Sequence, residues 1–259
     1  MDPPVTHTQK LLMAHGILMT FAFSVFMSTG ILFARHFRHH WPSTPIMGIK
    51  IWFHLHRTIN LIGIAASICG FAIIFVVNDW QWVGPSPSRT SVENRRWGSV
   101  HSMLGLLACV VAWAQPIIAV FRCHPGDRTR FIFNWIHRFL GFGALLMAAA
   151  ATMIACKHFE LFTNHDAAFG LYITFLVVYG VVLIAMEMLS VRRWWKNRKR
   201  VSEIEMSHLG ASGRTEPIEY VDDDDNSRTN TLLLLLMAFH LIVAIGVAVA
   251  ISVIIAKKK

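Results

Sequence analysis

The stretch GSVHSMLGLLACVVAWAQPIIAVF, residues 98–121, decides the fold of this 259-residue chain. It has no acidic or basic residue except one histidine, and a helix of about 20 such residues crosses the roughly 30 Å of hydrocarbon in a bilayer. Because 54% of the chain is hydrophobic, more than a soluble core of this size could bury, we predict an all-α, multi-pass integral membrane protein with six transmembrane helices. The other five apolar runs are residues 11–34, 51–76, 134–156, 168–190 and 232–256.

The apolar runs divide the chain into a core and an appended last helix. We expect a five-helix core over residues 11–190, preceded by an extracytoplasmic tail of residues 1–10. Segment 191–231 is polar, with an acidic run from Asp222 to Asp225, which is typical of a flexible cytoplasmic linker. The sixth helix, residues 232–256, and a basic tail, residues 257–259, complete the chain.

The basic residues predict how the helices are oriented. The loops after the first, third and fifth helices are rich in Lys and Arg, so these loops are expected in the cytoplasm and the N-terminus outside. Six helices then place the C-terminal lysines outside as well, against the same rule, which leaves the orientation of the last helix open. The net charge of +9 fits contact with anionic lipid beside the helices, and we expect no nucleic-acid partner.

Each of the first four apolar runs has a candidate histidine near one end: His15, His56, His101 and His137. Because consecutive helices run in opposite directions, His15 and His101 are expected near one membrane face, and His56 and His137 near the other. At 1.5 Å of rise per residue, the two pairs should be about 15 to 20 Å apart. The sequence therefore predicts two pairs of histidines and not one cluster of four.

Two imidazoles that face each other at one depth of a helical bundle can provide both axial ligands of an iron porphyrin. Gly105 and Gly141 follow His101 and His137 by four residues, which leaves flat space one turn along the same helix face. The alternative for each histidine is a hydrogen bond between helices, but four histidines matched in depth favour ligation and a four-helix di-haem core. The scattered cysteines lack the C-x-x-C-H spacing of covalent haem attachment.

Other ionisable residues receive structural interpretations. His54 competes with His56, since only one of them can face the bundle. His240 is expected to form a packing or hydrogen-bonding contact between helices, and Glu187 to pair with Arg192 or Arg193. The remaining histidines near helix ends are expected to be solvated: His36, His39, His40, His124, His158 and His165.

At these residues the chain resembles the cytochrome b561 family, and more closely its ferric-chelate reductase 1-like branch, in which the core is joined to an extracellular DOMON domain. The motifs AHGILM, WFHLHRT, HSMLGLLA and FNWIHRFLG contain His15, His56, His101 and His137 in that order. The resemblance covers about residues 11–190. It implies two non-covalent haem b groups with bis-histidine ligation, an outer one on His15 and His101 and an inner one on His56 and His137.

The resemblance also implies a function. The family passes electrons from cytosolic ascorbate, or a similar reductant, to an extracytoplasmic acceptor such as a ferric chelate or monodehydroascorbate. Because a bis-histidine haem has no open axial position, we expect outer-sphere electron transfer and no catalytic side chain. Lys50, Arg57 and Arg138 are the candidate residues that bind the reductant.

Several alternatives stay open at this point. A carrier of divalent metal ions would use the histidines as transient ligands, although such a pathway normally needs carboxylates at membrane depth. A non-redox membrane adaptor is the third candidate. The short N-terminal tail has no room for a DOMON domain, which leaves open whether the chain is a truncated or alternative form of a longer protein. We expect it in the plasma membrane or an endomembrane, and a homodimer is compatible with the resemblance.

Overall fold

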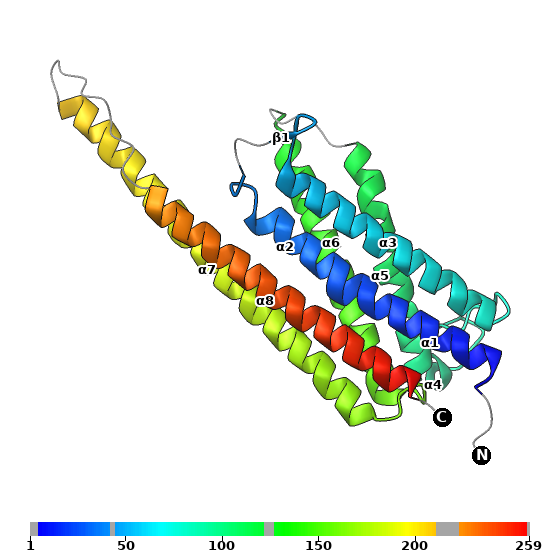
Figure 1. Cartoon of the computed structure of the whole chain (residues 1–259). Helices are drawn as coiled ribbons and strands as arrows, with labels where there is room; N and C mark the ends of the chain where they lie inside the picture. The colour runs from blue at the N-terminus through cyan, green and yellow to red at the C-terminus, as the bar shows by residue number, and fades with distance from the viewer. Residues whose placement is uncertain (1–4, 42–44, 122–126, 211–222, 258–259) are drawn as a thin grey trace.

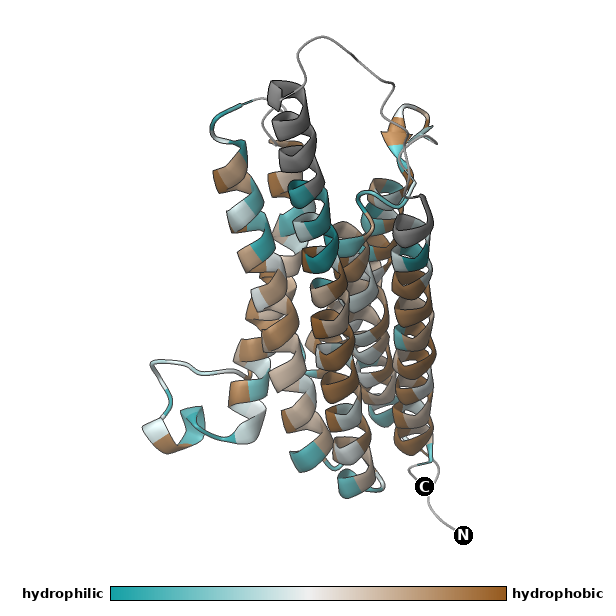
Figure 2. Cartoon of the chain, turned by 90° about the vertical axis from the view of Figure 1, so that its left-hand side faces the viewer, coloured by the Kyte–Doolittle hydropathy of each residue, from teal (hydrophilic) through white to brown (hydrophobic). Residues whose placement is uncertain are grey.

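The fold is all-α with six membrane-length helices, as predicted (Figure 1). The computed structural model describes residues 5–41, 45–121, 127–210 and 223–257. Apolar residues cover the middle of the helices and hydrophilic residues gather toward their ends (Figure 2), so the chain is an integral multi-pass membrane protein. Within the described residues, the candidate spans are His7–His36, Ile51–Val77, Trp97–Val120, Arg130–His158, His165–Lys199 and Ser227–Ala256.

The first span consists of three helical segments: α1 (His7–Thr20), the π-helix η1 (Phe21–Met27) and α2 (Ser28–His36). Thr6 begins it with a capping box, in which its Oγ1 accepts from the Gln9 backbone N–H at 3.2 Å and Gln9 Oε1 accepts from the Thr6 N–H at 2.8 Å. Helix therefore already starts inside the segment 1–10 that we expected to be a tail.

Three further helices complete the core: α3 (Ile51–Val77), α5 (Trp97–Val120) and α6 (Arg130–His158). A small antiparallel hairpin of β1 (Pro45–Ile46) and β2 (Ile49–Lys50) precedes α3. The loop between α3 and α5 contains the short helix α4 (Ser91–Asn94). Both chain termini lie at one end of the bundle, here called the terminal end, and the hairpin lies at the other, the distal end (Figure 1).

The last two helices, α7 (His165–Gly210) and α8 (Asp223–Ala256), pack side by side and extend past the core at the distal end (Figure 1). Helix covers residues 191–210 and 223–231, within the segment 191–231 for which we predicted a flexible linker. Lys, Arg and Glu favour helix even without burial, and Arg193 donates a hydrogen bond to Asn230 across the two helices. Residues 211–222 lie outside the described residues, as do His124 and the last two lysines.

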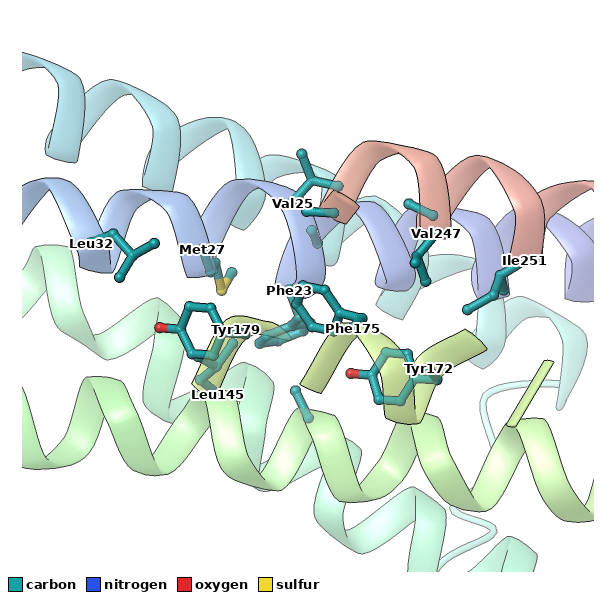
Figure 3. Close-up of a cluster of buried hydrophobic side chains, with 14 of the residues drawn as sticks. Phe23, Val25, Met27, Leu32, Leu145, Tyr172, Phe175, Tyr179, Val247 and Ile251 are labelled. Atoms are coloured by element: carbon teal, nitrogen blue, oxygen red, sulfur yellow. The ribbon is translucent and has the colours of Figure 1, made fainter. Parts of the chain in front are cut away.

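The first span is the most buried of the six and packs against α3 on one side and α7 and α8 on another. Figure 3 shows Phe23 and Val25 of η1 in one apolar cluster with residues of α6, α7 and α8. Many large apolar side chains elsewhere are exposed, for example Val181 at 61% and Ile242 at 71%. In a membrane protein such side chains face lipid, whereas much of the first span is enclosed by other helices.

Buried polar contacts test three of the structural interpretations. His240 Nε2 lies 3.1 Å from Ser28 Oγ and 3.3 Å from Thr29 Oγ1, so its expected role as a hydrogen-bonding residue between helices is confirmed. His36 was expected to be solvated but is buried, with Nδ1 at 3.1 Å from Ser190 Oγ. Glu187 pairs with Arg35 of α2, with 2.9 Å between Nε and Oε2, and not with its neighbours Arg192 or Arg193, because α2 presents its arginine directly to this part of α7.

Candidate cofactor sites

The structure brings the four histidines together in the two predicted pairs. The rings of His15 on α1 and His101 on α5 have their centroids 6.4 Å apart with 71° between their planes. The rings of His56 on α3 and His137 on α6 have centroids 6.3 Å apart and planes at 72°. The first span and α3 form one half of the core, and α5 and α6 form the other. Each pair therefore has one histidine in each half.

The separation of the rings fits one iron between each pair. A metal–imidazole bond is about 2 Å long and the ring centre lies about 1.1 Å from its nitrogen, so two imidazoles on one metal place their centroids about 6.2 Å apart. A direct hydrogen bond between the rings would instead bring the centroids to about 5 Å. The observed 6.3 and 6.4 Å agree with shared ligation and not with a direct contact.

Hydrogen bonds also select the ligating form of the imidazoles. Nδ1 of His15 lies 2.9 Å from the Gly70 carbonyl oxygen, and Nδ1 of His101 lies 2.9 Å from that of Ala151. His56 makes the same contact with Gly30, at 2.8 Å. Since a carbonyl oxygen can only accept, Nδ1 carries the proton in all three rings and Nε2 keeps the lone pair that a metal needs.

The choice between His54 and His56 is settled by their directions. His54 turns toward the β-hairpin, where its Nε2 donates to the Ile46 carbonyl oxygen at 3.0 Å. His56, two residues further along α3, faces the bundle and its partner His137. His54 therefore does not belong to the pair.

The same carbonyl contacts give the distance between the pairs along the bundle. On α3, His56 belongs to one pair while Gly70, 14 positions later, contacts the other. On α6, His137 and Ala151 stand in the same relation, again 14 positions apart. Fourteen residues of α-helix rise about 21 Å, so the separation is slightly larger than the expected distance of about 15 to 20 Å.

A cavity adjoins the His15–His101 pair, with about 700 Å³ of space inside it and at its mouth. Gly105 lines it, and a Cβ at Gly105 would have no atom within 4 Å, so this glycine leaves flat space beside His101 as the sequence predicted. The other walls come mostly from apolar side chains such as Phe71 and Phe75.

Beside the His56–His137 pair, Gly30 packs closely against Asn60. A Cβ at Gly30, whose carbonyl accepts from His56, would lie 2.0 Å from Asn60 Nδ2. Asn60 in turn donates to the His56 carbonyl oxygen at 2.6 Å. On the other side the ring of Phe133 stacks on His137, with centroids 5.8 Å apart and planes at 12°.

The predicted reductant-binding residues lie at the distal end, near this second pair. Lys50 precedes α3 and Arg57 and Arg138 directly follow His56 and His137, and all three are exposed. Sequence reasoning missed Arg38, whose guanidinium lies 5.4 Å from the centroid of the Trp52 ring. Burial and then the charge of Arg138 lower the pKa of Arg38, which shows that the cations of the two loops converge.

The pKa of His39 is also affected by these neighbouring cations. Burial lowers its pKa first, and the neighbouring cations Arg193, Lys50 and Arg38 lower it further. A surface with this potential favours an anion. The loops were visible in the sequence as basic segments, but only the fold shows that they meet.

The fold and the two sites define an integral membrane protein in which a helical core carries paired imidazoles at two depths. Comparison with known families then identifies it: the family described as eukaryotic cytochrome b561 matches residues 14–163, and the chain belongs to this family. Membership implies a b-type haem as the cofactor, in agreement with the donor set found here.

Curated relatives point to one branch of the family. Ferric-chelate reductase 1 of Bos taurus is 32% identical over 150 residues, which is 58% of this chain and 23% of the relative. The proteins of the same name from Mus musculus and Homo sapiens are 31% and 30% identical over 150 residues, with the same coverage of both chains. The chain thus aligns with about a quarter of the length of these relatives. No solved structure matches it.

Proposed function

We propose that the chain transfers electrons across a membrane through two haem b groups, one held by His15 and His101 and the other by His56 and His137. The electrons come from a cytosolic reductant, ascorbate or a similar compound, and go to an extracytoplasmic acceptor such as a ferric chelate or monodehydroascorbate. The proposal rests on the similar geometry of the two pairs. The ring centroids are 6.4 Å apart between α1 and α5 and 6.3 Å apart between α3 and α6.

The protein's contribution is to hold and orient the ligands. A haem with both axial positions filled supplies one-electron transfer and offers no open position to oxygen or substrate. The carbonyls of Gly70, Gly30 and Ala151 fix the orientation and tautomer of three imidazoles and increase their basicity as ligands. The apolar helices around them exclude water.

The distal end is suited to receive an anionic reductant. Lys50, Arg57 and Arg138 are the candidate binding residues, and Arg38 adds a fourth cation to the same region. A positive potential raises the local concentration of an anion such as ascorbate and its rate of encounter. Because these residues border the His56–His137 pair, electrons would enter there, and the positive-inside rule places this end in the cytoplasm.

The terminal end is suited to release electrons. The ring of Phe159 lies 4.8 Å from that of His101, and the neighbouring His158 stacks on Trp97 with centroids 4.3 Å apart and planes at 8°. Trp97 is 53% exposed. These aromatic side chains fill the short distance between the His15–His101 pair and the surface, so an acceptor that docks there comes close to the outer haem.

The structure favours this function over a carrier of divalent metal ions. Among the described residues no group of three or more His, Cys, Asp or Glu side chains is arranged to hold a metal ion. Glu187, the acid within a span that such a carrier would use, pairs with Arg35. A non-redox adaptor would need neither the paired rings nor the carbonyl contacts that fix their tautomers.

The test is the visible spectrum of the purified chain before and after addition of ascorbate and then dithionite. We expect the sharp bands of a b-type cytochrome and two haems per chain. His137→Ala should lose the inner haem and retain the outer one, whereas His54→Ala, a control two residues before His56 on α3, should retain both. A colourless protein, or an unchanged haem content in His137→Ala, would contradict the proposal.

A further inference from the structure

The segment that follows α3 forms one wall of the cavity beside the His15–His101 pair. Gln81, Trp82 and Val83 line the cavity together with the two histidines. This wall belongs to the loop of residues 78–96, whose first residues bond to the end of α3. Beyond them, residues 82–86 are held by contacts within the loop.

Arg89 makes an unusual number of these contacts. Its guanidinium donates to three consecutive carbonyl oxygens: Nη1 to Val83 at 2.7 Å, Nη1 to Gly84 at 2.8 Å and Nη2 to Trp82 at 3.3 Å. Only arginine among the side chains has several donors in a rigid planar fork. One side chain therefore fixes the backbone of the cavity wall.

The wall residues are folded tightly against each other. The Trp82 indole N–H donates to the Pro85 carbonyl oxygen at 3.0 Å. The indole also covers Gly84 so closely that a Cβ there would lie 2.0 Å from Trp82 Cζ2. The loop can take this shape only with glycine at position 84, and it places Trp82 at the cavity.

The base of the wall is strained. Asp79 and Trp80, which are consecutive, both have positive φ angles, 50° and 60°, a conformation that costs free energy for residues other than glycine. Such a backbone persists only when its surroundings hold it. On the other side the loop is tied down by Asn94, which exchanges two hydrogen bonds of 3.0 Å with the backbone of Ser86.

We propose that Arg89 is a positioning residue of the outer haem site. By holding the carbonyls of residues 82–84 it keeps Trp82 and Val83 against the cavity and excludes water from the haem that the cavity would contain. The inference rests on the proposed function, since it takes this cavity as the outer haem site. Solvent exposure stabilises the more positively charged ferric state and so lowers the reduction potential, which gives the wall a measurable effect.

The experiment compares Arg89→Gln and Arg89→Lys with Arg95→Gln in the purified full chain. Arg95 is a matched control, because it is an exposed arginine of the same loop and its hydrogen bonds among the described residues go to Ser91. The first measurement is backbone amide hydrogen exchange at Gln81, whose N–H donates to Asn78, and at Ser86, whose N–H donates to Asn94. It needs no haem. The second is a redox titration that resolves the two haems.

In Arg89→Gln we expect amide exchange at Gln81 and Ser86 to be about tenfold faster or more, because local opening becomes easier. The midpoint potential of the outer haem should fall while that of the inner haem stays the same. Arg89→Lys should behave like Arg89→Gln, since an ammonium group cannot bridge three carbonyls. Arg95→Gln should match the wild type in both measurements.

Two results would overturn the inference. Unchanged exchange in Arg89→Gln would show that Arg89 does not hold the wall. A full recovery of the outer potential in Arg89→Lys would show that Arg89 acts only through its charge. The proposed function is tested separately by the haem content of the wild-type chain, because the exchange measurement reports on the wall whether or not haem is bound.

Discussion

The two histidine pairs have nearly the same geometry and very different surroundings. Their ring centroids are 6.4 and 6.3 Å apart and their planes cross at 71° and 72°. The His15–His101 pair adjoins a cavity closed by a loop, whereas the His56–His137 pair lies beside a tight Gly30–Asn60 contact and a group of cations. The two pairs thus share their ring geometry and differ in the residues around them.

The largest effect should come from removing ligands in different combinations. His15→Ala and His101→Ala belong to one pair, so each single variant should lose about half of the haem and the double variant no more, because an axial haem ligand is lost only once. His15→Ala combined with His56→Ala should lose all of it. Pyridine haemochrome assays measure this content directly, and equal losses in both double variants would break the assignment of two separate pairs.

Glycine substitutions should distinguish Gly30, which packs against Asn60, from Gly105, which lines the cavity beside the His15–His101 pair. Gly30→Ala places a methyl group 2.0 Å from Asn60 Nδ2, and overpacking of this kind typically costs about 1–3 kcal/mol of stability. Gly105→Ala meets no protein atom within 4 Å, so the haem-free chain should keep its melting temperature but bind less outer haem. If the two variants had the same melting temperature and bound the same amount of haem, the proposed difference in packing around Gly30 and Gly105 would be contradicted.

Charge substitutions should affect only the distal end. Arg38→Gln or Arg138→Gln should slow reduction by ascorbate about threefold to tenfold at low ionic strength and weaken its salt dependence, because an anionic donor is then attracted less. Arg95→Gln, at the terminal end, is the control and should leave this rate unchanged. Stopped-flow reduction at several salt concentrations measures the effect, and an equal loss in the control would argue against a local binding region.

The smallest effect concerns pH. Burial and the charges of Arg193 and Lys50 lower the pKa of His39, so the folded state favours the neutral ring. The resulting stability is complete above the ordinary histidine pKa of about 6.5 and is lost as the pH falls through the lowered value. Melting temperatures should therefore decrease slightly on acidification, and less so in His39→Gln and in Lys50→Gln. An equal decrease of the melting temperature on acidification in the wild type and both variants would show that His39 does not contribute to the pH dependence of stability.

The sequence predicted the membrane class and the histidine pairs because both depend on strong, simple constraints. A run of about 20 apolar residues has few alternatives to a membrane helix, and antiparallel neighbours fix which histidines share a depth. The partner of His15 follows from this alternation without any knowledge of side-chain directions. The choice of His56 over His54 did need the structure, since it depends on how α3 is rotated in the bundle.

Contacts between distant segments could not be predicted in the same way. Glu187 pairs with Arg35, which is 152 positions away, although arginines five and six positions away were the obvious partners. His36 is buried because α7 covers the end of α2, and the polar segment after residue 190 continues as helix because α8 lies alongside it. The contacts of Arg89 with three carbonyls were equally invisible, since nothing in an isolated loop indicates which backbone groups face inward.

The π-helix η1 has a consequence for how the first span can vary. On α3 and α6 a histidine and the carbonyl that serves the other pair are 14 positions apart, but in the first span His15 and Gly30 are 15 apart. A π-turn takes up one residue more than the α-turn it replaces. The π-helix η1 therefore accommodates the one extra residue between His15 and Gly30 and keeps both aligned with their partners. Deleting one residue between positions 21 and 27 would make the segment regular and keep His15 and Gly30 aligned with their partners. The same deletion before position 15 or after position 30 would leave their spacing unchanged.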